Sequence, residues 1–185
     1  MRDVQIIAAD DASGNSRPDP DAAEGLTDEE QERRRRWFRE HWVDGVAFNR
    51  RCGMRIVSWD GEAVEIALPY ATDLSAHDGI FHGGVVAALL DTTATAAVIA
   101  GHDFSRGSRL TTISMSVQYL SVAPGEDLVC EGACTRRGRT VSFAQATARG
   151  ATSGKPVATC QVAVNIAGER PGAPWSRPSR DGRPA

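Results

Sequence analysis

The longest hydrophobic stretch of the chain covers residues 83–101, where every residue is apolar or small except for one charge, Asp91. The stretch ends at Gly101, a residue type favoured just past a helix C-terminus, so it predicts one long helix. A helix that is hydrophobic on all sides lies in a protein core or in a membrane. A carboxylate in such surroundings is costly unless it has partners or a function, which makes Asp91 the first candidate functional residue.

Alternating apolar and polar residues predict short strands on both sides of this helix. Before it, two such runs flank Asp60-Gly61, a dipeptide typical of a tight hairpin turn. After it come four strand-like runs separated by short turns, at residues 111–119, 128–134, 141–148 and 157–166. Links this short favour antiparallel neighbours, so these four strands are expected to form a meander. Strict alternation within the first run puts its odd-numbered residues on one face of the sheet.

Helix signals also precede the strands, over residues 26–51. Thr27 with Glu30 three residues later has the sequence of a capping box. Residues 33–36 are four consecutive arginines, which could bind phosphate or form a solvated helix face. A solvated face is the commoner meaning of such a run.

Both ends of the chain, residues 1–25 and 168–185, are rich in proline, glycine and polar residues, which predicts disordered tails. Residues 52–167 then form one domain. One long helix wrapped by a single antiparallel sheet of five to six strands is an α+β fold.

Composition narrows the expected partners and environment. A formal net charge of −3 leaves no large basic field, so no nucleic-acid partner is expected. The four cysteines lack CxxC spacing and no histidine cluster joins them, so neither a metal site nor a cofactor is expected. The N-terminus lacks signal-peptide features, and the central aspartate makes residues 83–100 a poor membrane span. The expectation is a cytoplasmic protein without a membrane partner.

Several motifs together carry a resemblance to a known family. The tripeptide His-Gly-Gly at residues 82–84 opens the long helix, and Asp91 follows eight residues after its first glycine. Downstream, residues 119–126 and 137–140 fit the strand and turn pattern of the same family. Over about residues 52–166 the chain resembles the hotdog-fold acyl-CoA thioesterases. The nearer branch is similar to the phenylacetate-degradation and 4-hydroxybenzoyl-CoA thioesterases.

This resemblance implies hydrolysis of an acyl-CoA thioester, with coenzyme A entering as part of the substrate. Asp91 matches the catalytic carboxylate, acting as a nucleophile or as a general base on water. Gly83 matches the backbone N–H that polarises the thioester carbonyl, and His82 and Gly84 shape that turn. General physics agrees, because a helix N-terminus offers unpaired N–H groups to a developing oxyanion. Asp91 could instead be a structural carboxylate, and His82 a turn-forming histidine.

Two hydroxyl groups match assisting positions in the family. Thr95 lies one helical turn beyond Asp91, where a hydroxyl can assist the carboxylate or the water. Thr112 matches a strand position where a hydroxyl can orient the water. Thr95 can equally bond back to the helix carbonyl four residues earlier, and Thr112 can be an ordinary strand threonine.

The chain departs from the family at Ala76, where an asparagine or glutamine usually stands six residues before the histidine of the His-Gly-Gly tripeptide. Ser75, His77, Asp78 or a water molecule could replace the missing amide. A substrate-binding role for His77 and Asp78 competes with that of ordinary polar loop residues.

Three arginines cluster in one turn, and they could bind the phosphates of coenzyme A or simply form a solvated hairpin: Arg136, Arg137 and Arg139.

Helix geometry constrains the assembly. Eight residues separate Gly83 from Asp91, which is about 12 Å along a helix at about 1.5 Å per residue. The two groups of one chain therefore cannot act on the same carbonyl. A working site needs Gly83 from one subunit and Asp91 from another, with helices antiparallel across a two-fold axis. This predicts a homodimer, or a homotetramer built from dimers.

Three other functions remain compatible with the sequence. One is a non-catalytic acyl-CoA-binding hotdog protein such as a ligand sensor. The second is a dehydratase-type hotdog protein, which would need an Asp/His pair in a different loop arrangement. The third is a structural protein that retains only the fold.

Overall fold

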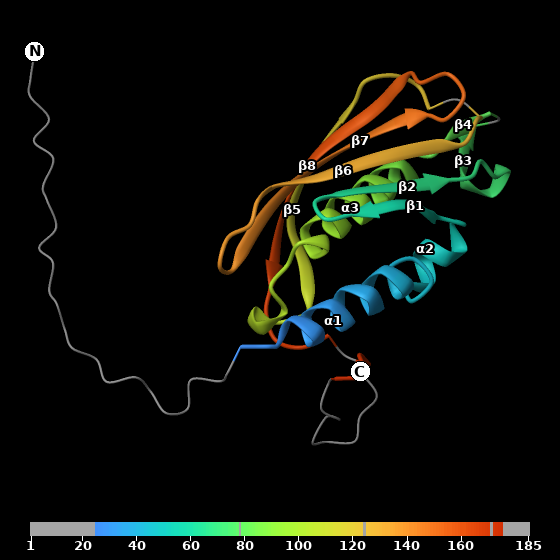
Figure 1. The fold of residues 1–185 in the computed structure, drawn as a ribbon. Helices are drawn as coiled ribbons and strands as arrows, with labels where there is room; N and C mark the ends of the chain where they lie inside the picture. The colour runs from blue at the N-terminus through green and yellow to red at the C-terminus, as the bar shows by residue number, and fades with distance from the viewer. Residues whose placement is uncertain (1–24, 78, 124, 171, 176–185) are drawn as a thin grey trace, which may run out of the picture.

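The computed structural model of the 185-residue chain describes residues 25–77, 79–123, 125–170 and 172–175 (Figure 1). It confirms the predicted α+β architecture, with one long helix packed against a six-stranded antiparallel sheet. The helices are α1 (Asp28–His41), α2 (Ala47–Arg51) and α3 (Gly83–Ala100), with short 3-10 turns η1 (Thr72–Leu74) and η2 (Phe104–Arg106). The strands are β1 (Arg55–Asp60), β2 (Ala63–Leu68), β3 (Ser75–His77), β4 (Ile80–Phe81), β5 (Leu110–Tyr119), β6 (Leu128–Arg136), β7 (Val141–Gly150) and β8 (Pro156–Ile166).

Helix α3 lies against one face of the sheet and forms the centre of the core (Figure 1). All nine of its residues from Thr92 to Ala100 are buried. Strand β6 approaches it so closely that a Cβ atom on Gly132 would lie 2.7 Å from the Thr93 carbonyl oxygen. By length and composition α3 alone among the described helices could cross a membrane, yet 67% of it is buried inside the protein, as in a core helix.

The sheet order is β1-β2-β6-β7-β8-β5, and this corrects the predicted four-strand meander. Strands β6, β7 and β8 follow one another as hairpins, as expected. Strand β5 does not pair with β6, because β2 and β7 already occupy the two edges of β6. It pairs instead with the remaining edge of β8 and becomes an outer strand of the sheet.

A bulge in β5 corrects the predicted alternation. The pairing with β8 shifts between Thr112, opposite Val164, and Ser114, opposite Ala163. Before the bulge the even-numbered Thr112 shares a face with buried Val164, whereas after it the odd-numbered residues share the face of buried Val162. A bulge inserts one residue and so reverses which side chains face inward. Thr112 thus lies on the helix-facing side of the sheet, together with Met115, Val117 and Tyr119.

The segment before the sheet forms two helices rather than the single helix expected over residues 26–51. The capping box is present, since the Thr27 hydroxyl accepts from the Glu30 N–H and the Glu30 carboxylate accepts from the Thr27 N–H. Helix α1 ends at His41, turn residues follow, and α2 begins at Ala47.

The first part of the C-terminal segment packs on the protein, in contrast to the disordered tail expected from residue 168. Trp175 contacts the edge of Trp37 at 5.1 Å between ring centroids, and Ala173 is buried. The Gly168 carbonyl accepts hydrogen bonds from the Ser108 and Arg109 N–H groups. The expected N-terminal tail lies almost entirely outside the described residues.

Candidate active site at the start of helix α3

The turn that opens α3 is held by local hydrogen bonds. His82 is the N-cap residue, and its Nδ1 accepts from the Gly84 N–H at 3.0 Å. Its backbone N–H donates to the Leu74 carbonyl at 2.9 Å, which ties the turn to η1. Because Nδ1 already accepts a hydrogen bond from the backbone, this geometry gives His82 the turn-forming role. Only Nε2 is left for other partners.

Gly83 occupies the first position of α3, where a backbone N–H has no partner within the helix. Within the described chain this N–H donates to no acceptor, and the residue is partly exposed. Its carbonyl does have an outside partner, because the Tyr119 hydroxyl donates to it at 2.7 Å. The sequence identified Tyr119 only as part of a motif. No local signal indicated this contact, which joins β5 to the first turn of α3.

Asp91 lies two turns further along α3, half-buried, with its carboxylate toward β5. The Thr112 hydroxyl donates to its Oδ1 at 3.0 Å. Burial raises the pKa of the Asp91 carboxyl above its ordinary value, and the bond from Thr112 partly offsets that rise. The negative charge of Asp91 also affects the thiol of buried Cys160 on β8. Burial raises the pKa of this thiol to about 11, and the charge of Asp91 contributes to the rise. Asp91 and Thr112 are therefore joined by a hydrogen bond between α3 and β5.

Thr95 does not join this unit. Its hydroxyl donates to the backbone carbonyl of Asp91 at 2.6 Å and contacts the Thr92 carbonyl at 3.2 Å, and its side chain is buried. These are the back-bonds expected of a threonine inside a helix. In this geometry the Thr95 hydroxyl donates its hydrogen bond to the helix backbone and not to the Asp91 carboxylate.

Among the described residues just before the turn, none carries a side-chain amide in place of Ala76. Ala76 and His77 are exposed on β3, and Asp78 lies outside the described residues. The Ser75 hydroxyl is 2.9 Å from the Tyr70 hydroxyl, which also accepts from the Gly79 N–H at 3.0 Å. Ser75 is therefore occupied in holding the β3–β4 loop.

The three turn arginines differ from one another. Arg136 and Arg139 are exposed, as a solvated turn or a phosphate contact would both allow. Arg137 reaches the other end of α3, where its Nη2 donates to the Ala97 carbonyl at 3.0 Å and its Nη1 to Glu62 at 2.7 Å. A cation that binds the last carbonyls of a helix also complements the helix dipole, so this geometry gives Arg137 a structural role.

The chemistry open to this site is that of a carboxylate and a free backbone donor. Within the described residues, no group of three or more metal-binding side chains comes together. A half-buried carboxylate with a raised pKa can act as a base or a nucleophile, and a free N–H at a helix N-terminus can stabilise an oxyanion.

The segment that contains this site is similar to known proteins. Residues 78–157 match the family model described as the thioesterase superfamily, and this range includes Gly83, Asp91 and Thr112. Acyl-coenzyme A thioesterase 13 of Mus musculus is 32% identical over 81 residues, which are 43% of this chain and 56% of the relative. A Halobacterium salinarum protein provisionally named an esterase is 35% identical over 89 residues, or 46% of this chain and 58% of the relative. The chain thus spans little more than half the length of these relatives.

Solved structures extend the likeness over most of the fold. A thioesterase family protein from Silicibacter pomeroyi superposes with a TM-score of 0.65 and 24% identity, covering 74% of this chain and 98% of that one. A conserved protein from Pseudomonas aeruginosa, PA5202, gives a TM-score of 0.62 and 26% identity, covering 69% and 98%. The fold is the hotdog fold of these solved structures, and residues 78–157 are similar to the thioesterase superfamily.

Proposed function

We propose that this protein hydrolyses an acyl-CoA thioester to a free acid and coenzyme A. The observation that carries the proposal is the half-buried Asp91 carboxylate, which the Thr112 hydroxyl orients on the same helix that exposes the free Gly83 N–H. The similarity to acyl-coenzyme A thioesterase 13 supports acyl-CoA as the substrate class. A thioester is an activated acyl group, so a base and one polarising donor are sufficient chemistry.

In this mechanism Asp91 either takes a proton from the attacking water or attacks the thioester carbon itself. The hydrogen bond from Thr112 holds the carboxylate toward β5. The Gly83 N–H donates to the carbonyl oxygen of the substrate as negative charge develops there. The acyl carbon then loses the CoA thiolate. Where Asp91 acts as the base, the thiolate takes up the proton that Asp91 removed from water. Where Asp91 attacks directly, a water molecule hydrolyses the acyl–Asp91 anhydride, which releases the acid, restores the carboxylate and supplies the proton for the thiolate.

The proposal requires two copies of the chain. Gly83 and Asp91 of one helix are about 12 Å apart, so each site would use Gly83 of one subunit and Asp91 of the other. The outer strand β5 supports this arrangement, because it carries Thr112 and has exposed apolar side chains at Ile113, Met115 and Tyr119. An outer strand of this kind is suited to pairing with a second copy. We propose a homodimer as the functional unit.

The test measures release of free coenzyme A with a thiol reagent from a panel of acyl-CoAs that differ in length and aromatic content. Asp91→Asn and Asp91→Ala should lower kcat/KM by about 10²–10⁴-fold while the protein stays folded. Asp60→Asn, which removes an exposed carboxylate from β1, should leave turnover unchanged. Full turnover by both Asp91 variants would exclude this mechanism. A wild-type protein that binds acyl-CoA but releases no coenzyme A would be the non-catalytic alternative.

Gly83 offers a matched pair of variants. Proline is well tolerated at the first position of a helix, and His82 before it already has the extended backbone that proline requires, with φ −64° and ψ 131°. Gly83→Pro therefore removes the N–H and should cost about 10²–10³-fold in kcat. Gly83→Ala adds a similar Cβ atom, 3.4 Å from the Tyr119 hydroxyl, but keeps the N–H and should stay within a few-fold of wild type.

Mixing these variants tests the shared site. In a mixed dimer of Asp91→Ala and Gly83→Pro chains, one site carries both lesions and the other carries neither. Random refolding of an equal mixture should therefore restore about a quarter of the wild-type rate from two inactive proteins. No recovery, although mixed dimers form, would place both groups in the same site of one chain and would contradict the proposal.

A further inference from the structure

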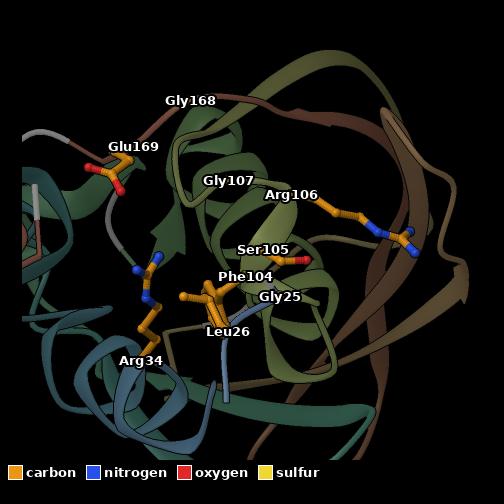
Figure 2. A pocket seen from close by; sticks show the side chains of 9 residues that line it. All are labelled: Gly25, Leu26, Arg34, Phe104, Ser105, Arg106, Gly107, Gly168 and Glu169. Carbon is orange, nitrogen blue, oxygen red and sulfur yellow. The ribbon is translucent and has the colours of Figure 1, made fainter. Parts of the chain in front are cut away.

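A cavity of about 360 Å³ lies beside the C-terminal end of α3, where the start of α1, the turn η2 and the segment around Gly168 meet (Figure 2). Leu26 and Phe104 give it an apolar wall, and Arg34 and Glu169 reach it with their charged groups. Figure 2 shows Arg34 and Glu169 on the same side of the cavity, with Arg106 pointing away. This end of α3 is opposite the Gly83 turn, so the cavity is separate from the proposed active site.

Arg34 differs from its neighbours on α1. Arg33 and Arg35 form ion pairs with Glu30 and Glu32 on the helix surface. Arg34 points inward, where its side chain is only 8% exposed and its Nε has no hydrogen-bond partner among the described residues. The face of its guanidinium lies over the ring of Trp175, 4.9 Å from the centroid.

The stacking on Trp175 uses the face of this guanidinium, while Nε on its edge has no hydrogen-bond partner among the described residues. A cation–π contact satisfies the face of an arginine, whereas its five N–H donors lie in the plane. An arginine stays charged at any physiological pH, and a buried charge is normally paired. Within the described chain, no carboxylate lies within 4.0 Å of Arg34. Glu169 is the acidic residue on the cavity wall, and its side chain is exposed.

We propose that this cavity binds a small organic monocarboxylate, with the carboxylate on the edge of Arg34 and a short apolar group against Leu26 and Phe104. The planar fork of arginine matches a carboxylate with two parallel hydrogen bonds. The buried Arg34 guanidinium with Glu169 also on the cavity wall suits a singly charged anion better than a phosphate dianion. The cavity volume is at the lower end of the range for small-molecule sites, which limits the ligand to a few carbon atoms or one ring.

The site is independent of the proposed catalysis. Arg34, Leu26, Glu169 and Trp175 all lie outside residues 78–157, the segment that matches the thioesterase superfamily. A bound carboxylate would fix α1, η2 and the C-terminal segment to one another, because all three contribute to the cavity. Its binding should therefore raise the melting temperature of the whole protein.

The test titrates the wild-type protein with acetate, butyrate, benzoate and phosphate at constant ionic strength, using calorimetry and thermal melting. Butyrate and benzoate should bind saturably and more tightly than acetate, and phosphate should bind most weakly. Arg34→Gln should weaken carboxylate binding by about 10- to 100-fold. The matched control Arg33→Gln removes an exposed arginine from the same helix and should leave binding unchanged. Glu169→Gln should tighten binding about 2- to 5-fold by removing the nearby negative charge.

A second variant keeps the test decisive if Arg34→Gln fails to fold. Ser105 is exposed on the cavity wall, and Ser105→Glu adds a carboxylate there, which should weaken binding without removing a core group. The proposal is overturned if no carboxylate binds saturably, if phosphate binds most tightly, or if Arg33→Gln weakens binding as much as Arg34→Gln. Binding that both Arg34→Gln and Ser105→Glu leave unchanged would belong to another site, such as that of the acid product near Asp91, and would equally overturn it.

Discussion

The two ends of helix α3 differ in whether their terminal backbone groups have hydrogen-bond partners. At the C-terminal end, Arg137 donates to the Ala97 carbonyl, and its guanidinium lies so close to Gly101 that a Cβ there would be 2.7 Å away. At the N-terminal end, His82 occupies the Gly84 N–H, and the Gly83 N–H has no acceptor in the described chain. One end is closed by a side chain, whereas the other keeps a donor available.

The difference shows how one helix can combine a buried, anchored end with an end that keeps a backbone donor available. The nine residues from Thr92 to Ala100 are buried under the sheet and anchor the helix. The first turn is only partly covered, and it holds its shape through His82 and Tyr119 rather than through burial. A rigidly anchored helix with one exposed terminus can present a donor in a fixed position, which electrostatic stabilisation of a transition state requires.

The closed end provides the largest expected effect. Arg137→Met should lower the free energy of unfolding by about 1–3 kcal/mol, because it removes charge-assisted bonds to the Ala97 carbonyl and to Glu62. Arg139→Met, the matched change at an exposed arginine of the same turn, should stay within about 0.5 kcal/mol. Urea unfolding measures both. The KM for acyl-CoA should not change with Arg137→Met. A higher KM at unchanged stability would instead make Arg137 a ligand of the CoA phosphates.

The open end should respond less in stability and more in rate. Tyr119→Phe removes only the hydroxyl that donates to the Gly83 carbonyl at 2.7 Å. Loss of one such bond costs about 0.5–1.5 kcal/mol. If Tyr119 positions the Gly83 turn for the transition state, kcat should fall about 2- to 10-fold with little change in KM. Steady-state kinetics on the best acyl-CoA measures this. A variant with wild-type kcat and a lower melting temperature would give Tyr119 a purely structural role.

The parts of this comparison that the sequence predicted depend on local signals. The uninterrupted apolar run gave the bounds of α3 almost to the residue, and the capping-box sequence located the start of α1. Asp91 stood out because it is the one charge in that run. The His-Gly-Gly turn was equally visible, since a cap and the first helical residue are neighbours in the sequence.

The parts that the sequence did not reveal depend on contacts between distant residues. The pairing of β5 with β8 is set by the edges that β2 and β7 leave free, which no single strand encodes. Because of the β5 bulge, Thr112 lies on the same face as Met115 and Val117, although strict alternation had put it on the opposite face. Arg137 belongs to a polar turn by sequence and reaches α3 only through the fold. Trp175 likewise belongs to a polar tail by sequence, and its aromatic partner Trp37 comes from the distant helix α1.

The smallest expected effect is the loss of folding stability caused by the buried negative charge of Asp91. Burial raises the pKa of this carboxyl in the folded protein, so the folded state binds its proton more tightly than the unfolded chain does. The resulting stabilisation is present at low pH and is lost as the pH rises from the ordinary value of 3.8 through the raised one. Above that window the charged form makes the fold less stable. Asp91→Asn, which is neutral throughout, should therefore melt at neutral pH no lower than wild type and on the order of 1–3 °C higher.

Two independent measurements must agree if this explanation is correct. The difference in melting temperature between wild type and Asp91→Asn should grow with rising pH and level off above the raised pKa of Asp91. If the charged carboxylate is the base or nucleophile, kcat/KM of the wild type should fall about tenfold per pH unit below a pKa of the free enzyme. Thermal melting and the pH–rate profile should then give the same value. A lower melting temperature for Asp91→Asn at neutral pH would show that the carboxylate stabilises the fold, and the contrast between an anchored end and a reactive end of α3 would then fail at its central residue.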